Sequence, residues 1–191
     1  MPGPVLFMNI AVVSGTGAKV VFQPEGGKQA ASAAQFVSEI ITELGEAWLA
    51  RLYKARILVL RTRSHALSVP AKINQVEIQH TLLGVELKAG KRRLLCPDLA
   101  TARYLAVFAR AGCTGVAVPY DITQISTLAD ELESSWHRML LLVEHVAAER
   151  SAQFRSRLRT LLVREARREI AEAGAGTLIP KFNQNTKQRR V

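Results

Sequence analysis

The chain has 191 residues, of which 48% are hydrophobic, and a formal net charge of +10 at pH 7. This size and composition predict a globular protein with one core or two small ones. No apolar run approaches the ~18 residues that a membrane-spanning helix needs, and no basic residue precedes the apolar segment 5–13. We therefore expect neither a membrane anchor nor a secretory signal, and we place the protein in the cytoplasm.

The N-terminal region predicts a hairpin, a helix and a strand. Residues 5–13 and 19–23 are apolar or β-branched on either side of a glycine-containing turn, which is typical of two paired strands. From about residue 28 to residue 52, apolar side chains recur at the spacing of one helix face. Gly45 weakens the continuity of that helix by about 1 kcal/mol relative to Ala. Residues 57–60 then predict a short buried strand.

Residues 84–120 repeat this order of hairpin, helix and strand. The alternation of apolar and polar residues on either side of Gly90 is typical of a hairpin. Asp98 is placed to cap the following helix, and Gly112 to end it. Residues 115–119 then form an apolar, valine-rich strand, which we expect to pair with the hairpin.

The two cysteines, Cys96 and Cys113, have no Cys-x-x-Cys partner. One lies in a predicted strand and the other directly after a helix. We therefore expect reduced, partly buried thiols without a metal-binding or redox role.

The pattern as a whole predicts an α/β fold, with α+β as the alternative. We expect a mixed sheet of five to seven strands with packed helices, including one further strand, an edge candidate, indicated by the spacing of Ile73, Val76 and Ile78. The predicted organisation is an α/β body at residues 1–120 made of two units, 1–61 and 84–120, a packed helical segment at 121–176, and a basic, flexible tail at 177–191.

The helical segment contains neither Gly nor Pro between residues 122 and 173. Asp121 and Gln124 are placed as a capping box at its start. An apolar stripe that includes Trp136 and a second stripe further along fit either one very long helix or two helices that meet near Ser151. Ordinary helix lengths favour two.

Most of the excess charge lies at the C-terminal end. Residues 150–191 contain eleven basic residues against three acidic ones, a net charge of +8, so the rest of the chain contributes only +2. This asymmetry favours a surface that binds a polyanion. The candidate phosphate contacts are four arginines within an arc of about 100° on the last helix and four basic residues of the tail: Arg157, Arg164, Arg167, Arg168, Lys181, Lys187, Arg189 and Arg190.

Our first hypothesis is therefore a non-enzymatic protein that binds nucleic acid, RNA or DNA, through phosphate contacts that weaken with salt. The alternative interpretation of the same arginines is a solvated helix face, for example with Arg168 paired to Glu172. Only Phe154 and Phe182 bring aromatic rings to this region, so stacking on single-stranded bases has little support.

A second hypothesis is a metal-dependent nuclease. Glu86 and Lys88 are two residues apart on a predicted strand, so they point to the same side, where they could hold a divalent metal and polarise a water. The Asp expected on the preceding strand is missing, and Glu77 is the only nearby substitute. Opposite charges are equally typical of a solvent-facing hairpin beside Lys91 and Arg93. Magnesium is needed only under this hypothesis. Otherwise we expect no cofactor, and we lean against an enzyme.

A third hypothesis is an assembly or scaffolding protein. The stripe that contains Trp136 would then form an interface with a second copy or another protein, and the basic face would dock on an acidic partner. The charge asymmetry favours the first hypothesis over the other two.

Overall fold

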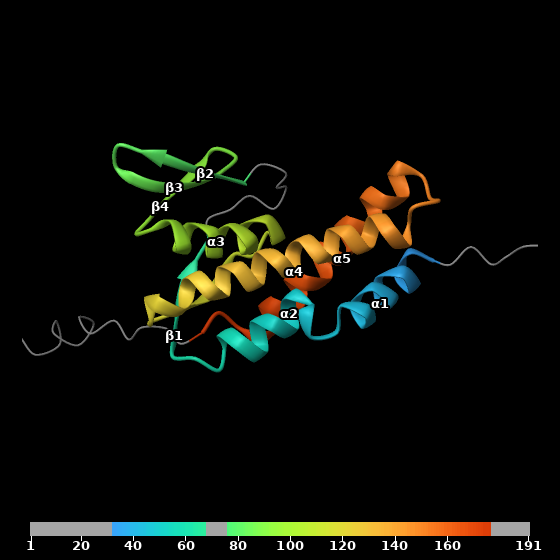
Figure 1. Ribbon diagram of the computed structural model, residues 1–191, viewed down its shortest axis with the longest axis horizontal. Helices are drawn as coiled ribbons and strands as arrows, with labels where there is room; N and C mark the ends of the chain where they lie inside the picture. The colour runs from blue at the N-terminus through green and yellow to red at the C-terminus, as the bar shows by residue number, and fades with distance from the viewer. Residues whose placement is uncertain (1–31, 68–75, 177–191) are drawn as a thin grey trace, which may run out of the picture. The chain divides into compact units, whose positions relative to one another are not determined.

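A computed structural model describes residues 32–67 and 76–176, and it combines helices with two small antiparallel sheets (Figure 1). The predicted N-terminal hairpin and the basic tail lie outside these ranges. The α/β class and the long helical C-terminal segment are confirmed. The five strands of the described part do not form one mixed sheet, because they divide into a two-stranded and a three-stranded sheet. The division of the chain at residue 120 stays a prediction.

The helix expected at residues 28–52 is present from Ser32 onward, but in pieces. Ser32 and Gln35 form a capping box at the start of α1 (Ala33–Leu44), in which the Ser32 N–H donates to Gln35 Oε1 at 2.6 Å. Gly45 ends α1 with a φ of 51°, a conformation that glycine adopts without strain. A 3₁₀ turn (Gly45–Ala47), α2 (Leu49–Leu52) and a π-helical turn (Tyr53–Ile57) follow.

The strand predicted at residues 57–60 is wrong. Ile57 is the last residue of the π-helical turn, where it is fully buried, and the Leu60 N–H donates to the Ile57 carbonyl. The apolar run therefore reflects packing of a helical turn. The strand is β1 (Thr62–Ala66), a polar segment whose sequence carries no strand signal.

The partner of β1 is β5 (Gly115–Pro119), with which it pairs in antiparallel register. The strand predicted at residues 115–119 is thus present, but its expected pairing with the central hairpin is wrong. That hairpin belongs to a separate antiparallel meander of β2 (Val76–Thr81), β3 (Gly84–Ala89) and β4 (Arg92–Cys96).

The caps predicted for the central helix, α3 (Leu99–Ala111), are confirmed. The Thr101 N–H donates to Asp98 Oδ1 at 2.7 Å, and Gly112 ends the helix in the left-handed region with a φ of 75°. One face of α3 packs on the three-stranded sheet and another packs on α4 (Figure 1). This helix therefore joins the sheet to the helical core.

The C-terminal segment forms two helices, α4 (Ile125–Val146) and α5 (Ala152–Ala173), as the helix-length argument favours. Ser151 caps α5, since its Oγ accepts the Phe154 N–H at 3.2 Å. At the other end of the segment, Asp121 accepts the Thr123 N–H at 3.0 Å and so caps a 3₁₀ turn (Ile122–Gln124).

The core is dominated by side chains from helices, with large rings at its centre. The fully buried side chains of largest volume include Trp48, Tyr53, Tyr104, Phe108 and Leu132.

Within the described ranges, no helix combines the length and the apolar character that crossing a membrane requires.

Candidate nucleic-acid interface

Helix α5 presents one apolar face to the core and one arginine-containing face to solvent. Leu158, Leu162, Ala166 and Ile170 follow one another at helical spacing and are at most 1% exposed. The opposite side carries exposed arginines. Because the buried face anchors the helix, the spacing of those arginines along it is set by the helix geometry.

Arg157 and Arg164 are exposed, and neither forms an ion pair or a hydrogen bond through its side chain with any residue of the described part. They lie seven residues apart, which corresponds to two turns or about 10 Å along one side of a helix. These two guanidinium groups are therefore available to an external anion.

Arg168 lies between two carboxylates of its own helix. Its Nη1 donates to Glu172 Oε1 at 2.6 Å, and its Nη2 and Nε donate to Glu165. The hydrogen bond from Arg168 is the main reason that the pKa of Glu165 is lowered from its ordinary value. The pairing with Glu172 that the sequence offers as the alternative interpretation is thus present.

Arg167 has a structural role. Its Nε donates to the carbonyl oxygen of Ala111 at 2.9 Å, and it therefore satisfies an acceptor at the C-terminal end of α3. The guanidinium lies against Gly112, where an added Cβ would be 2.9 Å from Nη2. Of the four helix arginines in the predicted set, two form no ion pair in the described part, one is paired with carboxylates and one binds the end of α3. The charge of Arg164 also contributes to the lowered pKa of Glu165.

Two further arginines of α5 bind a carboxylate that lies on α4. Arg159 Nε donates to Glu144 Oε1 at 3.1 Å, and Arg155 Nη1 is 3.6 Å from Glu144 Oε2. The hydrogen bond from Arg159 is the largest cause of a lowered pKa at Glu144, and the positive charges of both arginines add to it. Sequence reasoning missed this cluster because its members come from different helices.

The tail residues Lys181, Lys187, Arg189 and Arg190 lie outside the described residues, so their part in binding stays a prediction. Gly176, the last described residue, lies against Thr62 of β1.

The three residues of the nuclease hypothesis share the outer face of the three-stranded sheet. Lys88 is opposite Glu77, with 3.5 Å between Nζ and Oε2, and Glu86 Oε2 is 3.5 Å from Arg93 Nη1. Each carboxylate therefore faces a cation. In the described part of the chain, no group of three or more His, Cys, Asp or Glu side chains could hold a metal ion. The observed arrangement is that of a charged, solvent-facing hairpin.

The apolar stripe of α4 packs against other parts of the same chain. Trp136 is 9% exposed and Met139 1% exposed, and both belong to the core of this chain. Trp136 thus packs within its own chain, and the interface expected through this helix under the assembly hypothesis stays a prediction.

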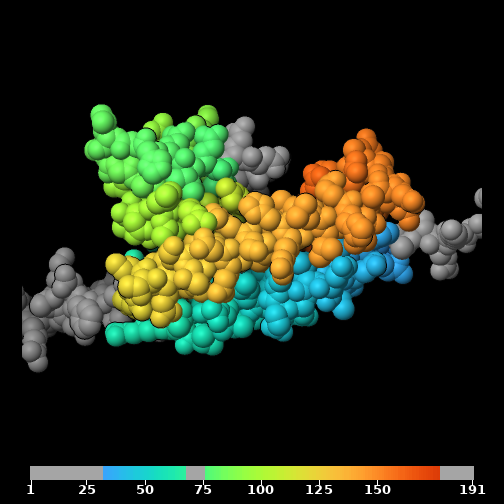
Figure 2. Space-filling model, in the orientation of Figure 1, coloured from blue at the N-terminus to red at the C-terminus, as the bar shows by residue number. Residues whose placement is uncertain are grey.

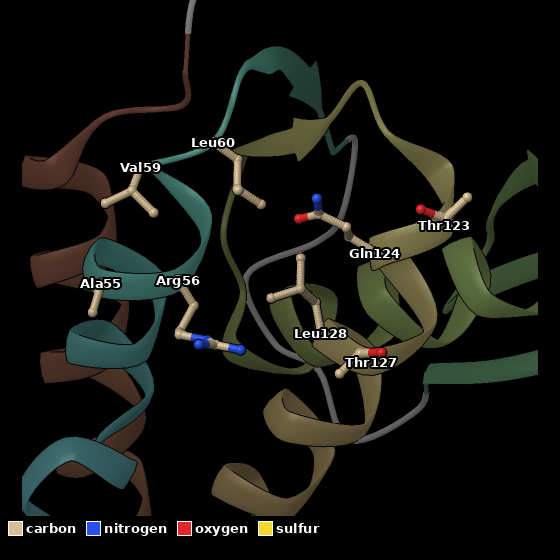
Figure 3. Close-up of a pocket in the computed structure, with 8 residues that line it drawn as sticks. All are labelled: Ala55, Arg56, Val59, Leu60, Thr123, Gln124, Thr127 and Leu128. Carbon is tan, nitrogen blue, oxygen red and sulfur yellow. The ribbon is translucent and has the colours of Figure 1, made fainter.

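A pocket of about 340 Å³ lies between the turns that follow α2 and the start of α4 (Figure 3). Its charged side chain, Arg56, binds Glu131 with hydrogen bonds of 2.8 and 3.1 Å, and the Gln124 amide donates to Asp121 at 3.1 Å. These polar groups are engaged within the protein, so the pocket presents no acid–base pair. Its lining consists of Ala55, Arg56, Val59, Leu60, Thr123, Gln124, Thr127 and Leu128.

Comparison with protein-family models, with curated proteins and with solved structures gives no match for this chain.

Proposed function

We propose that this protein binds nucleic acid without catalysing a reaction, through phosphate contacts from α5 and the basic tail. The observation that supports the proposal is the pair Arg157 and Arg164, which are exposed, unpaired in the described part and aligned on one side of an anchored helix. A guanidinium that lacks a carboxylate partner keeps its full set of donors for phosphate oxygens.

RNA and DNA both carry the phosphate groups that this site would contact, so the proposal covers both. Each neutralised phosphate releases condensed counterions, so the affinity must fall as salt rises, whatever the base sequence. A cytoplasmic location belongs to the same proposal.

Fluorescence anisotropy with labelled RNA and DNA of mixed sequence, at several salt concentrations, tests the proposal. Replacing Arg157 and Arg164 together by Gln should weaken binding and reduce the slope of log K against log salt by about 2, since each lost contact contributes about 0.9. The matched control replaces Arg92 and Arg138, which are also exposed and unpaired but lie on β4 and α4. Absence of binding at low salt, or an equal loss in the control, contradicts the proposal.

A further inference from the structure

Positive charge is unevenly distributed along α5 and the turn before it. We define the elbow as residues 144–164, which comprise the end of α4, the turn and the first half of α5 (Figure 1). The elbow contains five arginines and two glutamates, whereas residues 165–176 contain two arginines and three glutamates. The second half of α5 is thus slightly acidic, and the basic character of the helix belongs to the elbow.

The elbow keeps a formal net charge of +3, from five arginines and two glutamates. Arg155 and Arg159 share the single carboxylate of Glu144, so one positive charge remains in that cluster. The neighbouring helix α1 packs against α5 and adds the carboxylates of Glu39 and Glu43, which form no ion pair within the described part and reduce the positive charge on that side. Figure 2 shows the elbow as the orange surface at one end of α4 and α5, open to solvent on this face.

The phenylalanine rings at the elbow are not available for stacking on bases, and the exposed ring there is the imidazole of His145. Phe36 and Phe154 contact each other edge to face at 5.4 Å and are partly buried against the core. The Arg150 guanidinium lies 5.6 Å from the centre of one ring and 5.8 Å from the other. The most exposed aromatic side chain of the described part, Tyr120, lies directly after β5 and contacts Arg61 instead.

We infer that the elbow binds the sugar-phosphate backbone of double-stranded nucleic acid, in preference to single strands. This inference rests on the proposed function. The α5 arginines of the elbow, from Arg155 to Arg164, extend over about 13 Å of helix. A duplex presents one phosphate charge per ~1.7 Å of its axis, about twice the density of one of its strands. A rigid, dense cluster of cations therefore gains more from a duplex, and the covered rings remove the stacking energy that favours single strands.

The experiment compares short DNA and RNA duplexes of mixed sequence with their separated strands, using the full chain and fluorescence anisotropy at several salt concentrations. We expect duplexes of either kind to bind about tenfold or more tightly than single strands. An elbow variant carrying Arg150→Gln, Arg157→Gln and Arg164→Gln should lose most duplex binding, with a salt slope lower by about 3. The charge-matched control carries Lys91→Gln, Arg92→Gln and Arg138→Gln, and circular dichroism verifies that both variants remain folded.

The outcomes separate the inference from the function on which it rests. Single strands that bind as tightly as duplexes overturn the duplex preference and leave nucleic-acid binding standing. Equal losses in the elbow variant and the control overturn the location of the site. No binding of any nucleic acid at low salt overturns both the inference and the proposed function.

Discussion

The hydroxyl of Tyr53 accepts a hydrogen bond from the backbone N–H of Ala117 at 2.9 Å, and the two residues are 64 positions apart. The same hydroxyl donates to the carbonyl of Gly174 at 2.7 Å, while Tyr104 donates to the Ala117 carbonyl at 2.6 Å. The two tyrosines thus link the π-helical turn, α3, β5 and the end of α5 in one buried network. Burial is the main reason that the pKa of each tyrosine is raised.

Replacement of Tyr53 by Phe tests the network. The change should lower the free energy of unfolding by about 1–3 kcal/mol, because it leaves the buried N–H of Ala117 without a partner. Urea denaturation measures the effect. The control is Tyr120→Phe, at an exposed ring, which should change stability by about 0.5 kcal/mol or less. Equal effects of the two substitutions would show that the network contributes nothing measurable.

Arg167 and Arg164 lie three residues apart on α5 and should behave differently. Arg167→Gln removes the donor to the Ala111 carbonyl and should lower the free energy of unfolding by about 1–2 kcal/mol. Arg164→Gln should leave stability unchanged within about 0.5 kcal/mol and weaken nucleic-acid binding. Thermal unfolding and anisotropy on both variants separate the two roles. If Arg167→Gln leaves the free energy of unfolding unchanged but weakens nucleic-acid binding, then Arg167 belongs to the binding surface.

Both the backbone conformation and a neighbouring side chain require glycine at position 112. At a φ of 75°, a residue with a Cβ is strained, and that Cβ would also meet the Arg167 guanidinium at 2.9 Å. Gly112→Ala should therefore destabilise the protein by more than about 1 kcal/mol. Gly45→Ala provides a comparison, since Gly45 also has a positive φ but nothing within 4 Å of an added Cβ. If Gly112→Ala lowers the free energy of unfolding less than Gly45→Ala does, the contact between the added Cβ and the Arg167 guanidinium is not destabilising.

The ion pairs of Glu144 make the α4–α5 contact dependent on pH. The pKa of Glu144 is lower in the folded chain than in the unfolded chain, chiefly through the hydrogen bond from Arg159. Its contribution to stability is therefore fully present above the unfolded pKa and is lost as the pH falls through the folded pKa. Carboxyl NMR titration should show Glu144 ionising below its ordinary range, and Arg159→Gln should move the pKa upward. An unchanged midpoint in that variant would exclude Arg159 as the cause.

Both thiols should be unreactive in the folded protein. Burial raises the pKa of Cys113 to about 12 and also raises the pKa of Cys96, so little thiolate exists at pH 8. A thiol reagent such as DTNB should react slowly under native conditions and with two equivalents in denaturant. Rapid labelling of one thiol without unfolding would show that it is accessible.

Some local features of this protein follow from the sequence because their causes are local. Asp98 and Gly112 bound α3 through side-chain capping and a positive φ, and the turn at Gly90 connects two alternating strands. The break between α4 and α5 at Ser151 follows from helix length and a capping side chain. In each case the deciding interactions span only a few residues.

Tertiary structure decided which arginines are free and which strands pair. Periodicity places Arg164 and Arg167 on the same helix face, yet only the approach of α3 gives Arg167 an acceptor. Likewise, β1 is polar and becomes a strand because β5 offers it a hydrogen-bonding edge. The sequence by itself determined the caps, the helix periodicity and the C-terminal excess of charge, since these depend on neighbours along the chain. Strand partners, the carboxylate that Arg155 and Arg159 share, and the burial of Trp136 depend on residues brought together from distant positions.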